Sequence, residues 1–290
     1  MKDTPASAAS AASALDMIDL DAWPIDRPDS PAYQARLAEV REALAARGCA
    51  RVDGFVRPAY RAALDAEVDA IAPQAHFSTS EINPYFTKDD PSLPEDHPRR
   101  RFSTNTNGFV AMDRFPEQGL ALSLYRDPDF RRFIADALGE ETLYTFDDPL
   151  AGVVVNVMAE GQELAWHYDT NEFIVSLLSR KPLEGGEFEY VPELRQPGDE
   201  CYGEVQEVLD GRSDRVQRLA LELGDLQIFK GRFSMHRVVK GKGERHTVIF
   251  GYAKEPGFIG RVERTRKVHN RITQAHLDAE ARARNDGLAD

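Results

Sequence analysis

The stretch Leu164-Ala165-Trp166-His167-Tyr168-Asp169, followed after a turn by Phe173-Ile174-Val175-Ser176-Leu177-Leu178, decides the expected fold. Both runs are rich in aromatic and β-branched residues, which is typical of two short strands joined by a turn. Side chains alternate along a strand, so His167 and Asp169 point to one face and Tyr168 points to the other. The pair can therefore supply two adjacent ligands to one metal ion.

A second histidine in a similar setting completes a possible ligand set. His236 lies in a predicted strand, 234–239, which follows the turn-and-strand sequence Gly224-Asp225-Leu226-Gln227-Ile228-Phe229. Two histidines and one carboxylate leave one face of an Fe(II) ion open for a cosubstrate and O₂. Arg245 follows on the next predicted strand and is placed to hold an anionic end of that cosubstrate. This context strengthens the His-x-Asp triplet, which alone is weak evidence because such triplets occur by chance on solvated surfaces.

The segment around His236 resembles the distal half of the site in Fe(II)/2-oxoglutarate-dependent dioxygenases. The matching positions are Gly224-Asp225, Phe229, His236, Val238, Gly243 and Arg245. The resemblance implies that His167, Asp169 and His236 ligate iron, which 2-oxoglutarate chelates through its 1-carboxylate and 2-keto oxygen. It also implies that Arg245 forms a bidentate pair with the distal carboxylate. Fe(II), 2-oxoglutarate and O₂ are thus the expected cofactors and cosubstrates.

Two more residues are candidates for binding 2-oxoglutarate. Thr247 follows Arg245 by two positions and shares its strand face, so it resembles the Ser or Thr whose hydroxyl assists that arginine. Asn156 lies on an apolar predicted strand, Val153–Met158, and can donate a hydrogen bond to the cosubstrate. An Asn that satisfies a strand end or a turn is an equally good interpretation of Asn156.

Within this superfamily, the chain resembles bacterial hydroxylases of free amino acids and the related lysine-type radical halogenases. Segments 166–173, 185–192 and Gly251-Tyr252-Ala253 carry this resemblance, which covers roughly residues 145 to 265. Halogenases have Gly or Ala in place of the carboxylate ligand, which opens a coordination site for chloride, whereas this chain has Asp169. The resemblance therefore implies hydroxylation of an unactivated C–H bond, with succinate and CO₂ as coproducts.

The substrate is less well defined. Trp166, Thr170 and Asp148 are candidate contacts, because a free amino acid needs partners for its carboxylate and its ammonium near the metal. Asp147-Asp148-Pro149 is, however, more typical of a plain turn. Lysine-active relatives carry an acidic residue where Thr170 stands, which weakens a transfer of lysine specificity.

Two alternatives remain open from the sequence. One is the same chemistry on a peptide-bound residue or a natural-product intermediate. The other is a non-oxygenase metal-binding cupin, either an isomerase or a metabolite-binding regulator. Arg245 with Thr247 argues against this cupin, which has no need to anchor a distal carboxylate.

Composition favours an enzyme of small molecules. With 290 residues, of which 42% are hydrophobic, the chain can bury a sizeable core. The formal charge of −13 argues against nucleic acid or an anionic membrane surface as a partner, because neutralising phosphates requires a basic face. Cys49 and Cys201 are far apart and are expected to be free thiols. Without a long apolar run or a signal-peptide pattern, we expect a cytoplasmic monomer or homodimer.

We predict an α+β fold, a double-stranded β-helix (cupin-type jelly roll) with flanking helices. Residues 1–15 are expected to be a disordered leader, and 16–290 one domain. That domain divides into a helical, loop-rich N-terminal part (16–145), the jelly-roll core (146–255) and a C-terminal helical segment (256–290). Helices are predicted at 31–47, 58–71, 127–138, 201–209 and 261–284. Strands are predicted at 49–52, 151–158, 164–169, 173–178, 187–191, 219–223, 226–229, 234–239 and 246–253.

Residues 76–118 carry five prolines and are predicted to be loop, with a possible role as a lid. The run 99–107, which begins with three arginines, can contact substrate, although a solvated Arg run and a turn is the favoured interpretation. The remaining histidines are not assigned to the metal. We expect His76, His97, His269 and His276 at the surface, and His246 to face away from the cosubstrate because it alternates with Arg245.

Overall fold

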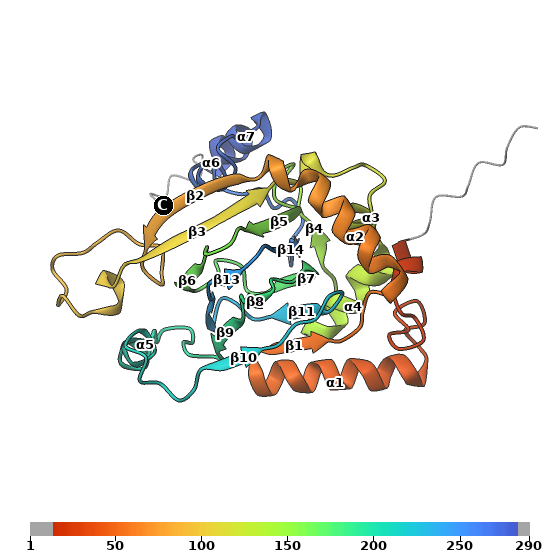
Figure 1. Ribbon diagram of the computed structural model, residues 1–290, viewed down its shortest axis with the longest axis horizontal. Coiled ribbons are helices and arrows are strands. Elements are labelled where there is room, and N and C mark those ends of the chain that lie inside the picture. The colour runs from red at the N-terminus through yellow and green to blue at the C-terminus, as the bar shows by residue number, and fades with distance from the viewer. Residues whose placement is uncertain (1–13, 284–290) are drawn as a thin grey trace, which may run out of the picture.

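A seven-stranded antiparallel sheet forms the frame of the protein in the computed structural model, which describes residues 14–283 (Figure 1). Its strand order is β1-β11-β7-β14-β5-β3-β2. The strands are β1 (Cys49–Val52), β2 (His76–Ile82), β3 (Ser103–Val110), β5 (Val153–Met158), β7 (Ile174–Arg180), β11 (Leu226–Phe229) and β14 (Arg245–Phe250).

A four-stranded sheet of order β10-β9-β12-β6 faces this frame. It contains β6 (Leu164–His167), β9 (Phe188–Val191), β10 (Gln217–Leu219) and β12 (Met235–Val238). Two short pairs join β8 (Glu184–Gly185) to β13 (Gly241–Lys242), and β4 (Tyr144–Thr145) to β15 (Tyr252–Ala253). The ring of Phe229 on the large sheet packs edge-on against Phe188 and Tyr190 of the small sheet, at centroid distances of 5.0 and 5.7 Å. The two sheets thus enclose an inner space, as the predicted jelly roll requires.

Helices cover the outer face of the large sheet (Figure 1). They are α1 (Pro31–Arg47), α2 (Pro58–Ile71), α3 (Leu120–Arg126) and α4 (Pro128–Leu138). Along β5, Val153, Val155 and Val157 point outward into this main core, so the alternate residues Asn156 and Met158 point inward. Burying the valine face against the helices supplies the hydrophobic stabilisation that fixes the strand register.

Local signals set the helix boundaries that the sequence predicts. The Ser30 hydroxyl accepts a hydrogen bond from Tyr33 N–H at the start of α1, and Gly48 ends the helix in the left-handed conformation at φ 62°. Helix α4 begins one residue later than predicted, because the Asp127 carboxylate caps it by accepting from the backbone of Asp129 and Phe130.

The loop predicted at 76–118 is wrong for residues 76–82 and 103–110, which form β2 and β3. Strands β2 and β3 pair along their whole length and extend the large sheet beyond β5. The five prolines all lie outside these strands. The strands are rich in Ser, Thr and Asn because β2 alternates between half-buried and exposed side chains at the sheet edge, which removes the apolar pattern of a core strand. Only the connection 83–102 is a long loop, and it contains one short 3₁₀ turn, Pro98–Arg100.

Three other predictions need correction. The strand predicted at 219–223 is instead β10 at Gln217–Leu219, because the Asp225 carboxylate holds the following residues in a turn by accepting from Glu222 N–H. The predicted helix 261–284 is two helices, α6 (Val262–His269) and α7 (Gln274–Ala283), separated at Asn270 in the left-handed conformation. Of the predicted leader, residues 1–13 lie outside the described residues, and Ala14 begins a 3₁₀ turn, Ala14–Met17, that is partly buried.

Other elements agree more closely. Helix α5 (Tyr202–Leu209) matches the prediction to within one residue, and 3₁₀ turns occur at Ala72–Gln74 and Met112–Arg114. Within residues 14–283, no helix is both long enough and apolar enough to span a membrane.

Candidate metal centre

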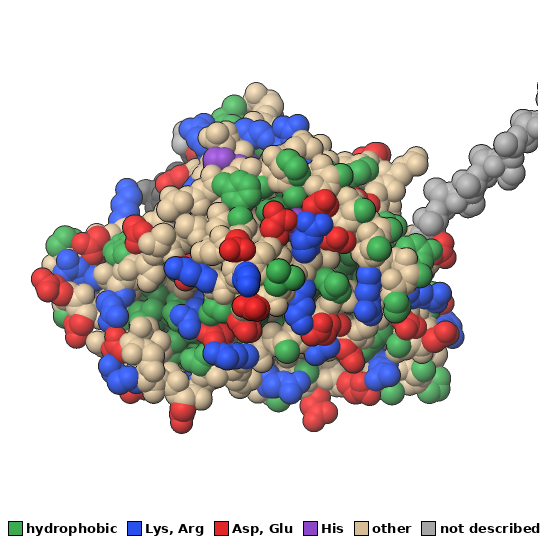
Figure 2. Space-filling view, viewed as in Figure 1, with side chains coloured by type: hydrophobic (Ala, Val, Ile, Leu, Met, Phe, Trp, Pro, Cys, Tyr) green, Lys and Arg blue, Asp and Glu red, His purple; other side chains and the backbone are tan. Residues whose placement is uncertain are grey.

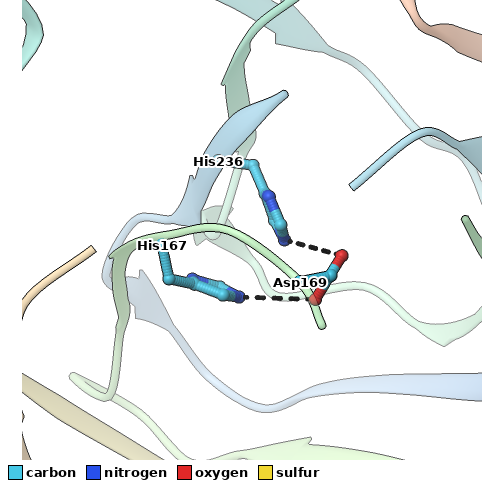
Figure 3. Close-up of side chains that lie close together, drawn as sticks. All are labelled: His167, Asp169 and His236. Atoms are coloured by element: carbon cyan, nitrogen blue, oxygen red, sulfur yellow. Dashed lines mark ion pairs between the residues drawn. The ribbon is translucent and has the colours of Figure 1, made fainter. Parts of the chain in front are cut away.

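Three side chains from β6, the turn that follows it and β12 meet at one point (Figure 3). His167 ends β6, and Asp169 follows two residues later. His236 on β12 lies opposite His167 in the strand register. Asp169 Oδ1 is 3.9 Å from His167 Nε2, and Asp169 Oδ2 is 3.4 Å from His236 Nε2. One ligand atom from each residue lies within 4.8 Å of the others, so the three can hold one metal ion.

Backbone carbonyls orient both imidazoles. The Nδ1 atom of His167 lies 2.7 Å from the carbonyl oxygen of Ala165, and that of His236 lies 3.0 Å from the carbonyl oxygen of Ser234. A proton on each Nδ1 donates to that carbonyl, which leaves the Nε2 lone pairs facing Asp169. Burial, together with the neighbouring His236, lowers the pKa of His167 to about 4. His167 is therefore neutral at pH 7, as a metal ligand must be.

The carboxylate of Asp169 has an unmet bonding requirement. Its Oδ2 atom is buried and accepts no hydrogen bond from the described residues. Buried carboxylate oxygens are normally paired, because removing them from water without a partner is costly. A cation between Asp169 and the two imidazoles satisfies this oxygen, so the donor set fits Fe(II) on the evidence of the geometry.

Gly231, which the sequence analysis missed, makes room for this carboxylate. Its carbonyl accepts a hydrogen bond from Asp169 N–H at 3.0 Å, and a Cβ at position 231 would overlap the Asp169 carboxylate. Lys230-Gly231 reads as an ordinary turn in the sequence, so no local signal marks its role.

Aromatic rings surround the two histidines. Phe188 and Phe229 lie against His236, at centroid distances of 5.5 and 4.8 Å. Phe86, in the loop between β2 and β3, places its ring 5.6 Å from that of His167. Phe86 is 46% exposed and has a φ of 55°, a strained conformation for an aromatic residue. The sequence gives no sign of this contact, because it depends on how the long loop folds back.

The three candidates for binding 2-oxoglutarate share the inner face of the large sheet. Thr247 on β14 pairs with Asn156 on β5, and Arg245 pairs with Met158, whose side chain packs inside between the sheets. Asn156 lies within its strand rather than at a strand end or turn, and its amide donates to the carbonyl of Gly108 at 3.4 Å.

Arg245 is a buried cation without an anionic partner among the described residues. Arg245 is 7% exposed, and its guanidinium donates to Thr247 Oγ1 at 2.6 Å. Burial lowers the pKa of Arg245 to about 10, which still leaves it charged at neutral pH. A buried charge of this kind is costly unless a ligand pairs with it, so the position fits the carboxylate of a bound dianion.

Two of the three candidate substrate contacts point elsewhere. Trp166 lies on the outer face of the small sheet, where the guanidinium of Arg237 stacks on its ring at 4.7 Å. Asp148 is fully buried, and its two oxygens accept from the backbone of Leu150, Ala151 and Gly260 and contact His276 Nε2. Both side chains are therefore engaged in contacts within the protein: Asp148 holds its own turn and contacts His276, and Trp166 packs against Arg237. Thr170 is exposed beside Asp169.

The predictions for the other histidines and for the arginine run have different outcomes. His246 packs away from Arg245, on the outer side of β14, as predicted. His269 and His276 are buried, which corrects their expected exposure, because α6 packs on β2 and β3 and His276 of α7 contacts the buried carboxylate of Asp148. In the run 99–107, Arg100 and Arg101 form ion pairs with Asp89 and Asp210, which fits a structural role, but residues 103–107 lie in β3 and not in the predicted turn.

A family comparison identifies the enzyme class. Residues 32–268 match the model of the Halogenase D family. The chain belongs to this family. It is therefore a non-haem iron dioxygenase that uses Fe(II), 2-oxoglutarate and O₂. Curated protein sequences give no match.

Solved structures show the same fold at low sequence identity. AviO1 from Streptomyces viridochromogenes Tue57 is 15% identical, with a TM-score of 0.51, over 74% of this chain and 94% of that chain. A prolyl hydroxylase from Trichoplax adhaerens, in complex with a hypoxia inducible factor peptide fragment, is 12% identical, with a TM-score of 0.50, over 79% and 96% of the two chains. At these identities the likeness shows the jelly-roll fold alone, and confirms it.

Proposed function

We propose that this enzyme hydroxylates an unactivated C–H bond of a free amino acid or an amino-acid-like small molecule, with succinate and CO₂ as coproducts. The observation that carries the proposal is the Asp169 carboxylate, which faces His167 and His236 in a family named for halogenation. A carboxylate at this position occupies the coordination site that a halide needs. The substrate is therefore expected to gain oxygen rather than chlorine.

The roles of the site residues follow from their contacts. His167, Asp169 and His236 would hold Fe(II), which supplies the oxygen chemistry when bound. The Ala165 and Ser234 carbonyls keep the two imidazoles turned toward the metal position.

The cosubstrate would lie along the inner face of the large sheet. Arg245 would pair with the distal carboxylate of 2-oxoglutarate, and the Thr247 hydroxyl holds the guanidinium in place at 2.6 Å. Asn156, directly opposite Thr247, would donate a further hydrogen bond. Phe188 and Phe229 exclude water from the side of the site next to His236.

Family membership decides against the non-oxygenase cupin. The remaining alternative is the same chemistry on a peptide-bound residue or a natural-product intermediate. The peptide-bound prolyl hydroxylase shares only the fold with this chain, so it does not favour a peptide substrate.

The decisive experiment measures succinate release by the purified enzyme with Fe(II), ascorbate, O₂ and 2-oxoglutarate against pooled free amino acids. Mass spectrometry then searches for a product that is one oxygen atom heavier than a component of the pool. Succinate release together with such a product supports the proposal and identifies the substrate. Succinate release without a heavier product points to peptides or pathway intermediates. A chlorinated product in the presence of chloride would contradict the role given to Asp169.

A further inference from the structure

The residue directly after Asp169 meets an arginine from the far end of the chain. The Arg264 guanidinium, on α6, donates a hydrogen bond to the Thr170 hydroxyl. Arg232 donates to the Thr170 carbonyl oxygen at 3.1 Å, from the turn that follows β11. Two arginines from separate parts of the sequence thus flank the turn that carries the metal ligand Asp169.

Arg264 has unused bonding capacity. Its side chain is exposed, and no Asp or Glu among residues 14–283 lies within ion-pair distance of it. Its single side-chain hydrogen bond uses one of the five N–H groups of a guanidinium. Loss of solvent around its guanidinium lowers the pKa of Arg264, and the negative charge of nearby Asp169 partly offsets this without forming an ion pair. A free fork of donors therefore lies beside the candidate metal centre.

Holding α6 in place does not require Arg264. Helix α6 packs on β2 and β3 through the buried side chains of Thr265 and His269. In addition, His276 of α7 contacts the buried carboxylate of Asp148. Figure 2 shows Lys and Arg side chains gathered along the edge of the molecule where α6 and α7 lie. The hydrogen bond from Arg264 to Thr170 is thus not needed to hold α6 in its position.

We infer that Arg264 binds the carboxylate of the substrate, exchanging its hydrogen bond to the Thr170 hydroxyl for a bidentate pair with that carboxylate. The inference rests on the proposed function and narrows its substrate class. Charge-assisted pairs of this kind are about twice as strong as hydrogen bonds between neutral groups, so the exchange is favourable. The substrate carries a carboxylate at the end that reaches Thr170. Since Arg232 and Arg264 both flank this position, a substrate ammonium group is disfavoured there.

The test is a binding measurement that needs no turnover. Calorimetry follows the binding of proteinogenic amino acids, and of the same amino acids as α-carboxamides, to the enzyme loaded with Fe(II) and 2-oxoglutarate in the absence of O₂. The proteins compared are the wild type, Arg264→Ala, Arg264→Lys and Arg266→Ala. Arg266 is the matched control, because it lies exposed on the same helix and its side chain makes no hydrogen bond or ion pair within the described residues.

The wild type should bind at least one amino acid and prefer it to its carboxamide by about tenfold or more, the usual value of a charged hydrogen bond. Arg264→Ala should lose that preference, and Arg264→Lys should keep part of it, because a point charge replaces the fork. Arg266→Ala should behave as the wild type.

Two results overturn the inference. One is an Arg264→Ala protein that still distinguishes carboxylate from carboxamide, and the other is a wild type that binds no carboxylate of the pool. The first leaves the proposed function intact. A failure of the proposed function itself appears separately, as binding with the expected preference but without an oxygenated product when O₂ is admitted.

Discussion

The carboxylate of Asp169 packs directly against the α-carbon of Gly231, and the backbone N–H of Asp169 donates to the carbonyl of Gly231 at 3.0 Å. The turn after β6, which carries Asp169, and the turn after β11, which carries Gly231, are therefore packed against one another. A side chain at position 231 and a carboxylate at position 169 compete for the same space.

Gly231→Ala should displace the Asp169 carboxylate and weaken Fe(II) binding by about tenfold or more, in the range seen when groups that orient metal ligands are removed. The φ of Gly231 lies outside the left-handed region, so the backbone itself tolerates alanine. Anaerobic titration with Fe(II) measures the change.

Introducing Gly231→Ala into the Asp169→Gly variant tests whether the weaker Fe(II) binding is caused by displacement of the Asp169 carboxylate. There the added methyl group meets no carboxylate, so Gly231→Ala should have little further effect on metal affinity. Gly203→Ala is a matched control, because a Cβ at that position meets open space and its φ is not in the left-handed region. An equal loss in both backgrounds would show that Gly231 acts through the fold and not through Asp169.

Arg245→Met should have opposite effects on the stability of the fold and on the affinity for 2-oxoglutarate. Removing a buried cation that lacks a partner should raise the free energy of unfolding of the 2-oxoglutarate-free enzyme, by about 1–3 kcal/mol given the lowered pKa of Arg245. The same change should weaken 2-oxoglutarate binding by about tenfold to a hundredfold. Urea unfolding with and without 2-oxoglutarate measures both effects.

Arg237→Met is the matched control for this experiment. Arg237 pairs with the buried carboxylate of Glu189 at 2.7 Å, so its loss should destabilise the protein and leave 2-oxoglutarate affinity unchanged. If Arg245→Met behaved like Arg237→Met, the guanidinium of Arg245 would have a structural role instead.

Much of this architecture is readable from the sequence because local signals agree with the tertiary fold. Helix α1 carries its own start at Ser30 and its own stop at Gly48, so its bounds are predictable. His167 and His236 occupy predicted strands, and strand alternation alone places His167 and Asp169 on one side. The structure adds the pairing of His236 with His167, which depends on a register between distant segments.

The failures share a physical cause, because each depends on contacts between distant parts of the chain. β2 and β3 are polar, and only their mutual pairing and the neighbouring β5 make them strands. Trp166 is the exception, because its position follows from strand alternation itself: it precedes His167 on β6 and so points to the opposite face. The burial of His276 depends on α7 returning to Asp148, which lies far away in the sequence.

The buried contact between His276 and Asp148 should stabilise the C-terminal helices. His276 Nδ1 accepts from the backbone N–H of Thr273, so Nε2 carries the proton that points to Asp148 Oδ2 at 3.1 Å. His276→Ala and Asp148→Asn should each lower the free energy of unfolding by about 1–3 kcal/mol. The double variant should lose less than the sum, since both changes remove one contact. Urea unfolding of the four proteins gives this coupling, and strict additivity would contradict it.

His269 should make stability depend on pH. Its ring borders a cavity of about 310 Å³ beside α6, and its Nδ1 atom is buried without a hydrogen-bond partner among the described residues. Burial lowers the pKa of His269 to about 4. Between about pH 6.5 and pH 4 the unfolded chain therefore binds a proton at this residue that the folded protein does not.

The free energy of unfolding should thus fall as the pH is lowered through this window, by at most about 1.4 kcal/mol per pH unit from His269. His269→Gln removes the titrating group and should flatten the dependence, leaving the part due to His167 and His246, whose pKa values are also lowered by burial. Lys267→Gln, on the exposed side of the same helix, should leave the slope unchanged. Urea unfolding at a series of pH values measures how the free energy of unfolding depends on pH. If this slope were identical in His269→Gln and the wild type, His269 would not be a buried neutral group.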